Sequence, residues 1–60
     1  MIDEHVRSVV RDYALRVNAA VERAKELGQG VLVLWSGVDF TVEVTPDVPA
    51  GHLIERRVNA

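Results

Sequence analysis

The side chains that could bind a metal ion are few and scattered. The two histidines, His5 and His52, lie near opposite ends of the chain, which contains no cysteine. A zinc site needs His, Cys or carboxylate ligands that recur at short, defined spacings. Neither histidine has a paired carboxylate at such a spacing. We therefore expect no bound metal, and we interpret both histidines as surface residues.

The remaining polar residues that could support catalysis fit turns better than an active site. Ser36 precedes Gly37 but lacks the flanking glycines of a nucleophile elbow. Asp39 and Glu43 lie on the solvent side of a predicted hairpin, whereas acid–base catalysis needs a carboxylate in a pocket. The segment 28–30 follows a helix and precedes a strand, the reverse of a phosphate-binding loop. The sequence predicts no enzyme activity, no cofactor and no small-molecule substrate.

The basic residues offer one alternative function. Arg56 and Arg57, together with Arg7 and Arg11, could form a local patch for nucleic acid. However, nine acidic residues outnumber seven basic ones, whereas small nucleic-acid-binding proteins usually carry a positive excess. Small repressors that read DNA with a two-stranded ribbon also place the strand before the helices, and the predicted order is the opposite. A small nucleic-acid-binding regulator is therefore the second interpretation.

These residues are positioned by three predicted elements, the first of which is a long amphipathic helix. Apolar residues recur every three or four positions over the first half of the chain, which predicts a helix from about residue 3 to residue 27. Asp3 is a suitable N-cap, and Gly28 can adopt the left-handed conformation that ends helices. The apolar seam consists of Val6, Val10, Tyr13, Val17, Ala20, Ala24 and Leu27.

The second element is a β-hairpin over about residues 30–45, where the apolar period changes to two. A two-residue turn at Gly37 and Val38 would place Trp35 opposite Phe40. One face is then wholly apolar and should pack on the helix; it comprises Val31, Val33, Trp35, Phe40, Val42 and Val44. The other face is half apolar, because Leu32 and Leu34 lie there beside polar residues.

The third element is a tail over residues 46–60. Pro46 and Pro49 exclude a continuous helix. A weak alternation from His52 to Val58 predicts a short third strand, with a last helical turn as the alternative. The whole chain, residues 1–60, is predicted to be a single α+β domain: a long N-terminal helix packed on an antiparallel hairpin.

The small size of this domain suggests self-association. A chain of 6.7 kDa should expose roughly 3,900 Å² when folded. Domains of this size often need a disulfide, a metal or oligomerisation for stability, and a disulfide is excluded here. In addition, a helix of about 36 Å overhangs strands of about 24 Å by about 12 Å. Because the predicted loop at residues 28–30 is short, the overhang should include Ile2, Val6 and Val9, with Val10 at its border.

We therefore predict a homo-oligomeric protein–protein interaction or assembly protein, whose partner is a second copy or another protein. The expected interface residues are Val6, Val9, Val10, Tyr13, Leu32 and Leu34. In the alternative, the tail covers the overhang. The layout is of a general kind seen in many short accessory proteins, including those of viruses and mobile elements. The charged amino terminus and the short apolar runs predict a cytoplasmic protein that makes no membrane contact.

Overall fold

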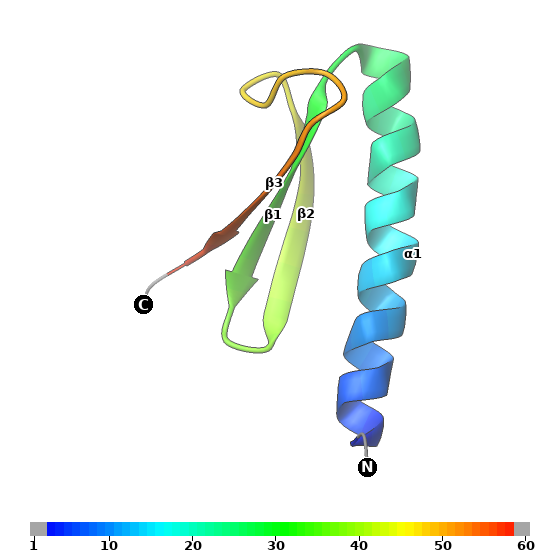
Figure 1. Cartoon of the computed structure of the whole chain (residues 1–60), viewed down its shortest axis with the longest axis vertical. Coiled ribbons are helices and arrows are strands. Elements are labelled where there is room, and N and C mark those ends of the chain that lie inside the picture. Colours follow the sequence, from blue (N-terminus) through cyan, green and yellow to red (C-terminus); the bar gives the residue numbers. More distant parts are fainter. Residues whose placement is uncertain (1–2, 59–60) are drawn as a thin grey trace.

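The computed structural model describes residues 3–58, which form one helix and a three-stranded sheet (Figure 1). The order along the chain is α1 (Glu4–Leu27), β1 (Gly30–Ser36), β2 (Asp39–Thr45) and β3 (Leu53–Arg57). The helix lies against one face of the sheet. The predicted α+β class is confirmed.

The ends of α1 follow from its capping residues. Asp3 has extended backbone angles, and its side chain accepts a hydrogen bond of 3.2 Å from the backbone N–H of His5. Gly28 adopts a left-handed conformation with φ of 67°. The next residue, Gln29, donates its backbone N–H to the carbonyl of Ala24 at 2.9 Å, which satisfies one carbonyl of the last turn. The predicted helix of about residues 3–27 is confirmed.

The hairpin has the predicted turn and register. Gly37 has φ of 62°, while Val38 keeps a negative φ, as a turn of the Gly-X kind requires. Trp35 therefore pairs with Phe40, and the antiparallel pairing continues to Gly30 opposite Thr45. A single positive-φ residue thus sets which side chains of both strands face the helix.

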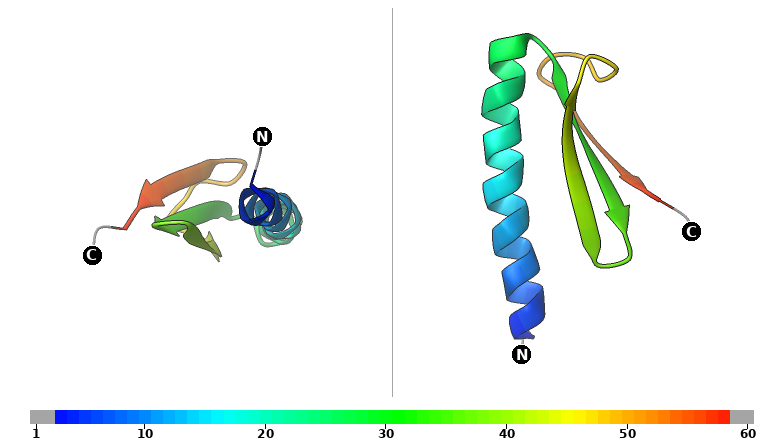
Figure 2. Two further views of the ribbon diagram at one scale, coloured as in Figure 1. Left: turned by 90° about the horizontal axis from the view of Figure 1, so that it is seen from below. Right: turned by 180° about the vertical axis from the view of Figure 1, so that it is seen from behind.

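The tail forms the predicted third strand, although the sequence did not indicate its position. β3 pairs with β1 in parallel, and the strand order is β2-β1-β3. The backbone N–H of Val31 donates to the carbonyl of His52 at 3.1 Å, and that of Val58 donates to the carbonyl of Trp35 at 2.6 Å. Viewed from one end of the molecule, β2 and β3 lie on opposite sides of β1 (Figure 2).

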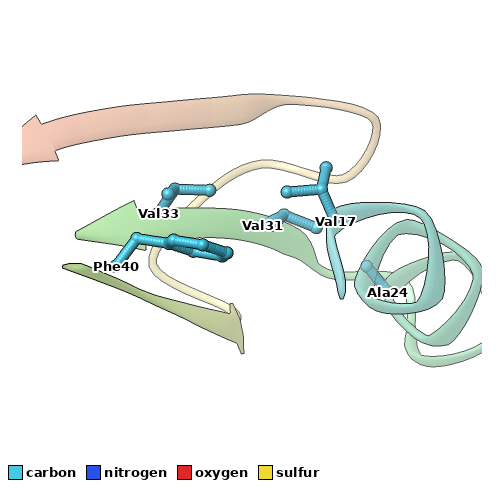
Figure 3. Packing of buried hydrophobic residues seen from close by; sticks show 5 residues of the cluster. All are labelled: Val17, Ala24, Val31, Val33 and Phe40. Atoms are coloured by element: carbon cyan, nitrogen blue, oxygen red, sulfur yellow. The ribbon is translucent and has the colours of Figure 1, made fainter. Parts of the chain in front are cut away.

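The core lies between α1 and the apolar face of β1 and β2. Val31 and Val33 of β1 are 2% and 0% exposed. They pack with Val17 and Ala24 of the helix and with Phe40 of β2 (Figure 3). Partly buried residues surround this cluster, namely Val9, Tyr13, Ala20, Val21, Trp35, Val42 and Val44. The predicted contact between the helix seam and the wholly apolar face is confirmed.

The connection from β2 to β3 closes the loop end of the sheet. Val48 is buried against Gly30, where a Cβ atom would lie 2.6 Å from the carbonyl oxygens of Val48 and Pro49. Only a glycine leaves room for this approach. Within residues 3–58, the backbone of α1 approaches β1 and β2 closely, whereas β3 reaches the helix only through side chains. The tail therefore covers the loop end of the sheet and leaves the helix overhang open.

Candidate interaction surfaces

The amino-terminal end of α1 extends past the hairpin turn (Figure 1). Val6 and Val10 belong to the apolar seam and were expected in or beside the overhang; they are 48% and 62% exposed. Val9 is half-buried against the core cluster. Ile2, which was also expected in the overhang, lies outside the described residues. The overhang thus presents apolar side chains that the sheet does not cover.

An apolar groove runs between the amino-terminal half of α1 and the hairpin turn. We name it the amino-terminal groove; its main lining residues are Val6, Val9, Val10, Tyr13, Trp35 and Val38. Four of these residues were predicted interface residues. Val38 was not among the predicted interface residues, because its position in the sequence indicated only a turn. A β-branched apolar residue at an exposed turn position was the available signal.

An aromatic cluster supports the groove from the sheet side. The ring centroids of Tyr13 and Trp35 lie 5.7 Å apart in a stacked arrangement. Phe40 is tilted against both rings, with centroids 5.6 Å from Tyr13 and 5.2 Å from Trp35. The guanidinium carbon of Arg16 lies 4.6 Å from the centroid of the Phe40 ring. These contacts hold the middle of α1 on the hairpin beside the groove.

Glu55 of β3 joins this cluster through hydrogen bonds. The Tyr13 hydroxyl donates to the Glu55 carboxylate at 2.5 Å, and the Trp35 indole N–H donates to the same oxygen at 3.5 Å. The hydrogen bond to Glu55 raises the pKa of Tyr13, and desolvation adds to the increase. Sequence reasoning missed Glu55 because only the pairing of β3 with β1 brings it near Tyr13. Since the carboxylate accepts two hydrogen bonds, we assign it a structural role that ties β3 to α1.

The second face of the sheet, which points away from α1, carries another apolar surface. Leu32 and Leu34 are half-buried there, as is Ile54 of β3, which pairs with Leu32. We name these three residues the leucine face. No helix or strand of residues 3–58 lies over it. The sequence placed both leucines on this face but did not predict that Ile54 would join them.

The structure separates the arginines of the alternative prediction. Arg7 and Arg11 lie on α1 beside the exposed valines of the overhang. Arg56 pairs with Leu34 and Arg57 pairs with Trp35, so their side chains point to opposite faces of the sheet. The helix pair lines one pocket with Val6 and Val10, and the strand pair lines another with Trp35 and Glu55. The nucleic-acid patch stays a prediction.

Two further findings concern metal and membrane sites. Within residues 3–58, no three or more His, Asp or Glu side chains gather in a group that could hold a metal ion. In the same part of the chain, α1 is not long and apolar enough to cross a membrane. Comparisons of the chain with protein-family models, with curated proteins and with solved structures found no match.

Proposed function

We propose that this chain is a homo-oligomeric protein–protein interaction or assembly protein. The observation that carries the proposal is its large accessible surface. The folded chain exposes 4732 Å², whereas a monomer of 6.7 kDa should expose roughly 3,900 Å². The difference is roughly 800 Å², which is about the area that one partner contributes to a standard protein–protein interface.

The shape of the molecule supports the same proposal. Its radius of gyration is 12.4 Å, whereas about 10 Å is typical of a compact domain of 60 residues. The extents of 39 × 25 × 13 Å describe a thin, elongated body. In such a body the helix and the sheet cover each other on one side only, and the outer side of each layer stays exposed. A second copy would supply the missing cover.

The amino-terminal groove and the leucine face are the surfaces that association would bury. The groove lining is mostly apolar, and the exposed valines of α1 extend it beyond the hairpin turn. Burial of apolar area is the dominant favourable contribution to most protein–protein association. Self-association would therefore complete a core that one chain leaves partly open.

Thermal unfolding at several protein concentrations tests this proposal. Association that occurs only in the folded state stabilises the fold by mass action, so the unfolding temperature should rise with concentration. We expect such a rise for the full chain. An unfolding temperature that is independent of concentration over a wide range would contradict the proposal.

A further inference from the structure

We infer that two copies of this chain join by antiparallel pairing of their β2 strands around a twofold axis that passes beside Val42. The inference rests on the proposed self-association and specifies β2 as the strand through which the two copies meet. It would join two 3-stranded sheets into one continuous sheet, with both helices on the same face.

The backbone groups of β1 alternate in direction, and this alternation determines which backbone groups of β2 are free. β1 is the central strand of the sheet. The backbone groups of Val31 and Trp35 form hydrogen bonds with the β3 side, as described above. Since the backbone groups of successive residues point to opposite sides of a strand, those of Leu32 and Leu34 point toward β2.

The register then shows which groups of β2 face outward. Glu43 lies opposite Leu32, and Thr41 lies opposite Leu34, so both direct their backbone N–H and C=O groups to β1. The alternating residues of β2 direct theirs to the outer edge of the sheet. These outward residues are Phe40, Val42 and Val44. In residues 3–58 no strand pairs with this edge.

The β2 edge carries few of the features by which proteins prevent edge pairing. Such features include charged side chains, proline, bulges and very short strands, and the charged residues of β2 are Asp39 and Glu43. β2 has seven residues with neither proline nor lysine, and its pairing with β1 continues without a bulge. The other edge strand, β3, is shorter and carries Glu55, Arg56 and Arg57 in sequence. The β2 edge is therefore the better template for a second copy.

The charges of β2 select one register. In a twofold antiparallel pair, the residue beside the axis lies opposite itself. A twofold axis beside Glu43 would place the Glu43 carboxylates of the two copies opposite each other. An axis beside Thr41 would place Asp39 of one copy opposite Glu43 of the other. Like charges directly opposite each other destabilise a strand pair. Centring on Phe40 or Val44 pairs less than half of the strand.

Centring on Val42 avoids these conflicts and uses the whole strand. Val42 then lies opposite its own copy, and Phe40 lies opposite Val44 of the second copy, so the face that bears α1 stays apolar. On the other face, Thr41 lies opposite Glu43 of the second copy, so the Thr41 hydroxyl can donate a hydrogen bond to the Glu43 carboxylate. Each outward N–H and C=O of β2 also gains a backbone partner.

Amide hydrogen exchange of the full chain, measured by NMR at several concentrations, tests the pairing directly. We expect the amides of Phe40, Val42 and Val44 to become protected as the concentration rises. The amides of Thr41 and Glu43 should be protected throughout, because they bond to β1. Unprotected amides at the three outward positions, in a sample shown to be oligomeric, would overturn the inference and leave the proposed function standing.

Charge substitutions at Thr41 provide a second test. Thr41→Glu places a carboxylate opposite Glu43 of the second copy at two symmetric positions, which should raise the dissociation constant roughly 2- to 30-fold. Thr41→Lys places an ammonium group there and should lower it by a similar factor. Arg56→Gln, which changes the net charge by the same amount as Thr41→Glu but lies on β3, serves as the control. Equal dissociation constants for the two Thr41 variants would overturn the inference.

The two proposals fail in different ways. If the unsubstituted chain is a monomer at every concentration, the proposed function and the β2 contact both fall. If the chain associates but neither the protection pattern nor the Thr41 variants respond, only the β2 contact falls. The variant Val6→Asp/Val10→Asp separates the β2 contact from the overhang, because these valines lie outside the β2 edge. At a protein concentration raised far enough to offset its weaker association, the outward β2 amides of this variant should still become protected.

Discussion

Replacement of the two exposed valines of the overhang by aspartate should weaken self-association strongly. Val6→Asp and Val10→Asp together put two carboxylates on a surface that we expect to be buried between copies. The substituted positions are 48% and 62% exposed, so the folded monomer tolerates a polar side chain there better than in the core. The change therefore acts mainly on the contact between copies.

The magnitude follows from the exposed fractions. Full burial of a valine side chain is worth roughly 2 kcal/mol, and about half of each side chain is still exposed, so an interface gains about 1 kcal/mol per valine. A symmetric contact buries both residues of both copies and gains about 4 kcal/mol from them. This corresponds to a dissociation constant about 700-fold higher in the double variant, before the cost of desolvating the carboxylates.

Sedimentation equilibrium of the double variant and the unsubstituted chain measures this change. Leu15→Asp is the matched control, because Leu15 is a 64% exposed apolar residue on the opposite side of α1. We expect the weight-average mass of the double variant to fall at every concentration, while the control keeps the mass of the unsubstituted chain. An unchanged mass in the double variant would refute the assignment of the overhang as an interface.

Three further predictions concern stability and charge. Gly30→Ala should lower the free energy of unfolding by roughly 1–3 kcal/mol in denaturant titrations, because its Cβ would meet the carbonyl oxygens of Val48 and Pro49 at 2.6 Å; a loss below about 0.5 kcal/mol would contradict this reason. Glu55 raises the pKa of Tyr13, so the folded state holds the phenol proton more tightly than the unfolded chain. The resulting stabilisation should be complete below pH ~10 and lost as the pH rises further, and Tyr13→Phe should remove that loss in alkaline unfolding curves; identical curves would count against the hydrogen bond. On heparin, a chain with a net charge of −2 should elute at low salt, whereas strong retention that falls steeply with salt would favour the nucleic-acid interpretation.

The sequence predicted the elements whose boundaries depend on local chemistry. Asp3 and Gly28 mark the ends of α1 because a cap acts through its own side chain or backbone. Gly37 marks the hairpin turn for the same reason, and the period of two then determines every pair of β1 and β2. The exposure of Val6 and Val10 followed from comparing the lengths of the helix and the strands.

The features that depend on long-range packing were not predictable in the same way. A weakly alternating segment of five residues carries no signal for which edge it joins or in which direction it runs. The contact of Glu55 with Tyr13 depends on that placement. The need for a glycine at position 30 likewise depends on the path of the tail past Val48. For the candidate surfaces, the sequence therefore indicated the valines and leucines but missed Val38 and Ile54.

Sedimentation equilibrium of the unsubstituted chain over a wide concentration range tests the central claim most directly. The account predicts a weight-average mass that rises with concentration to at least twice the 6.7 kDa of one chain. A mass that stays at 6.7 kDa over the whole range would contradict it. The exposed area of 4732 Å² would then belong to an open monomer.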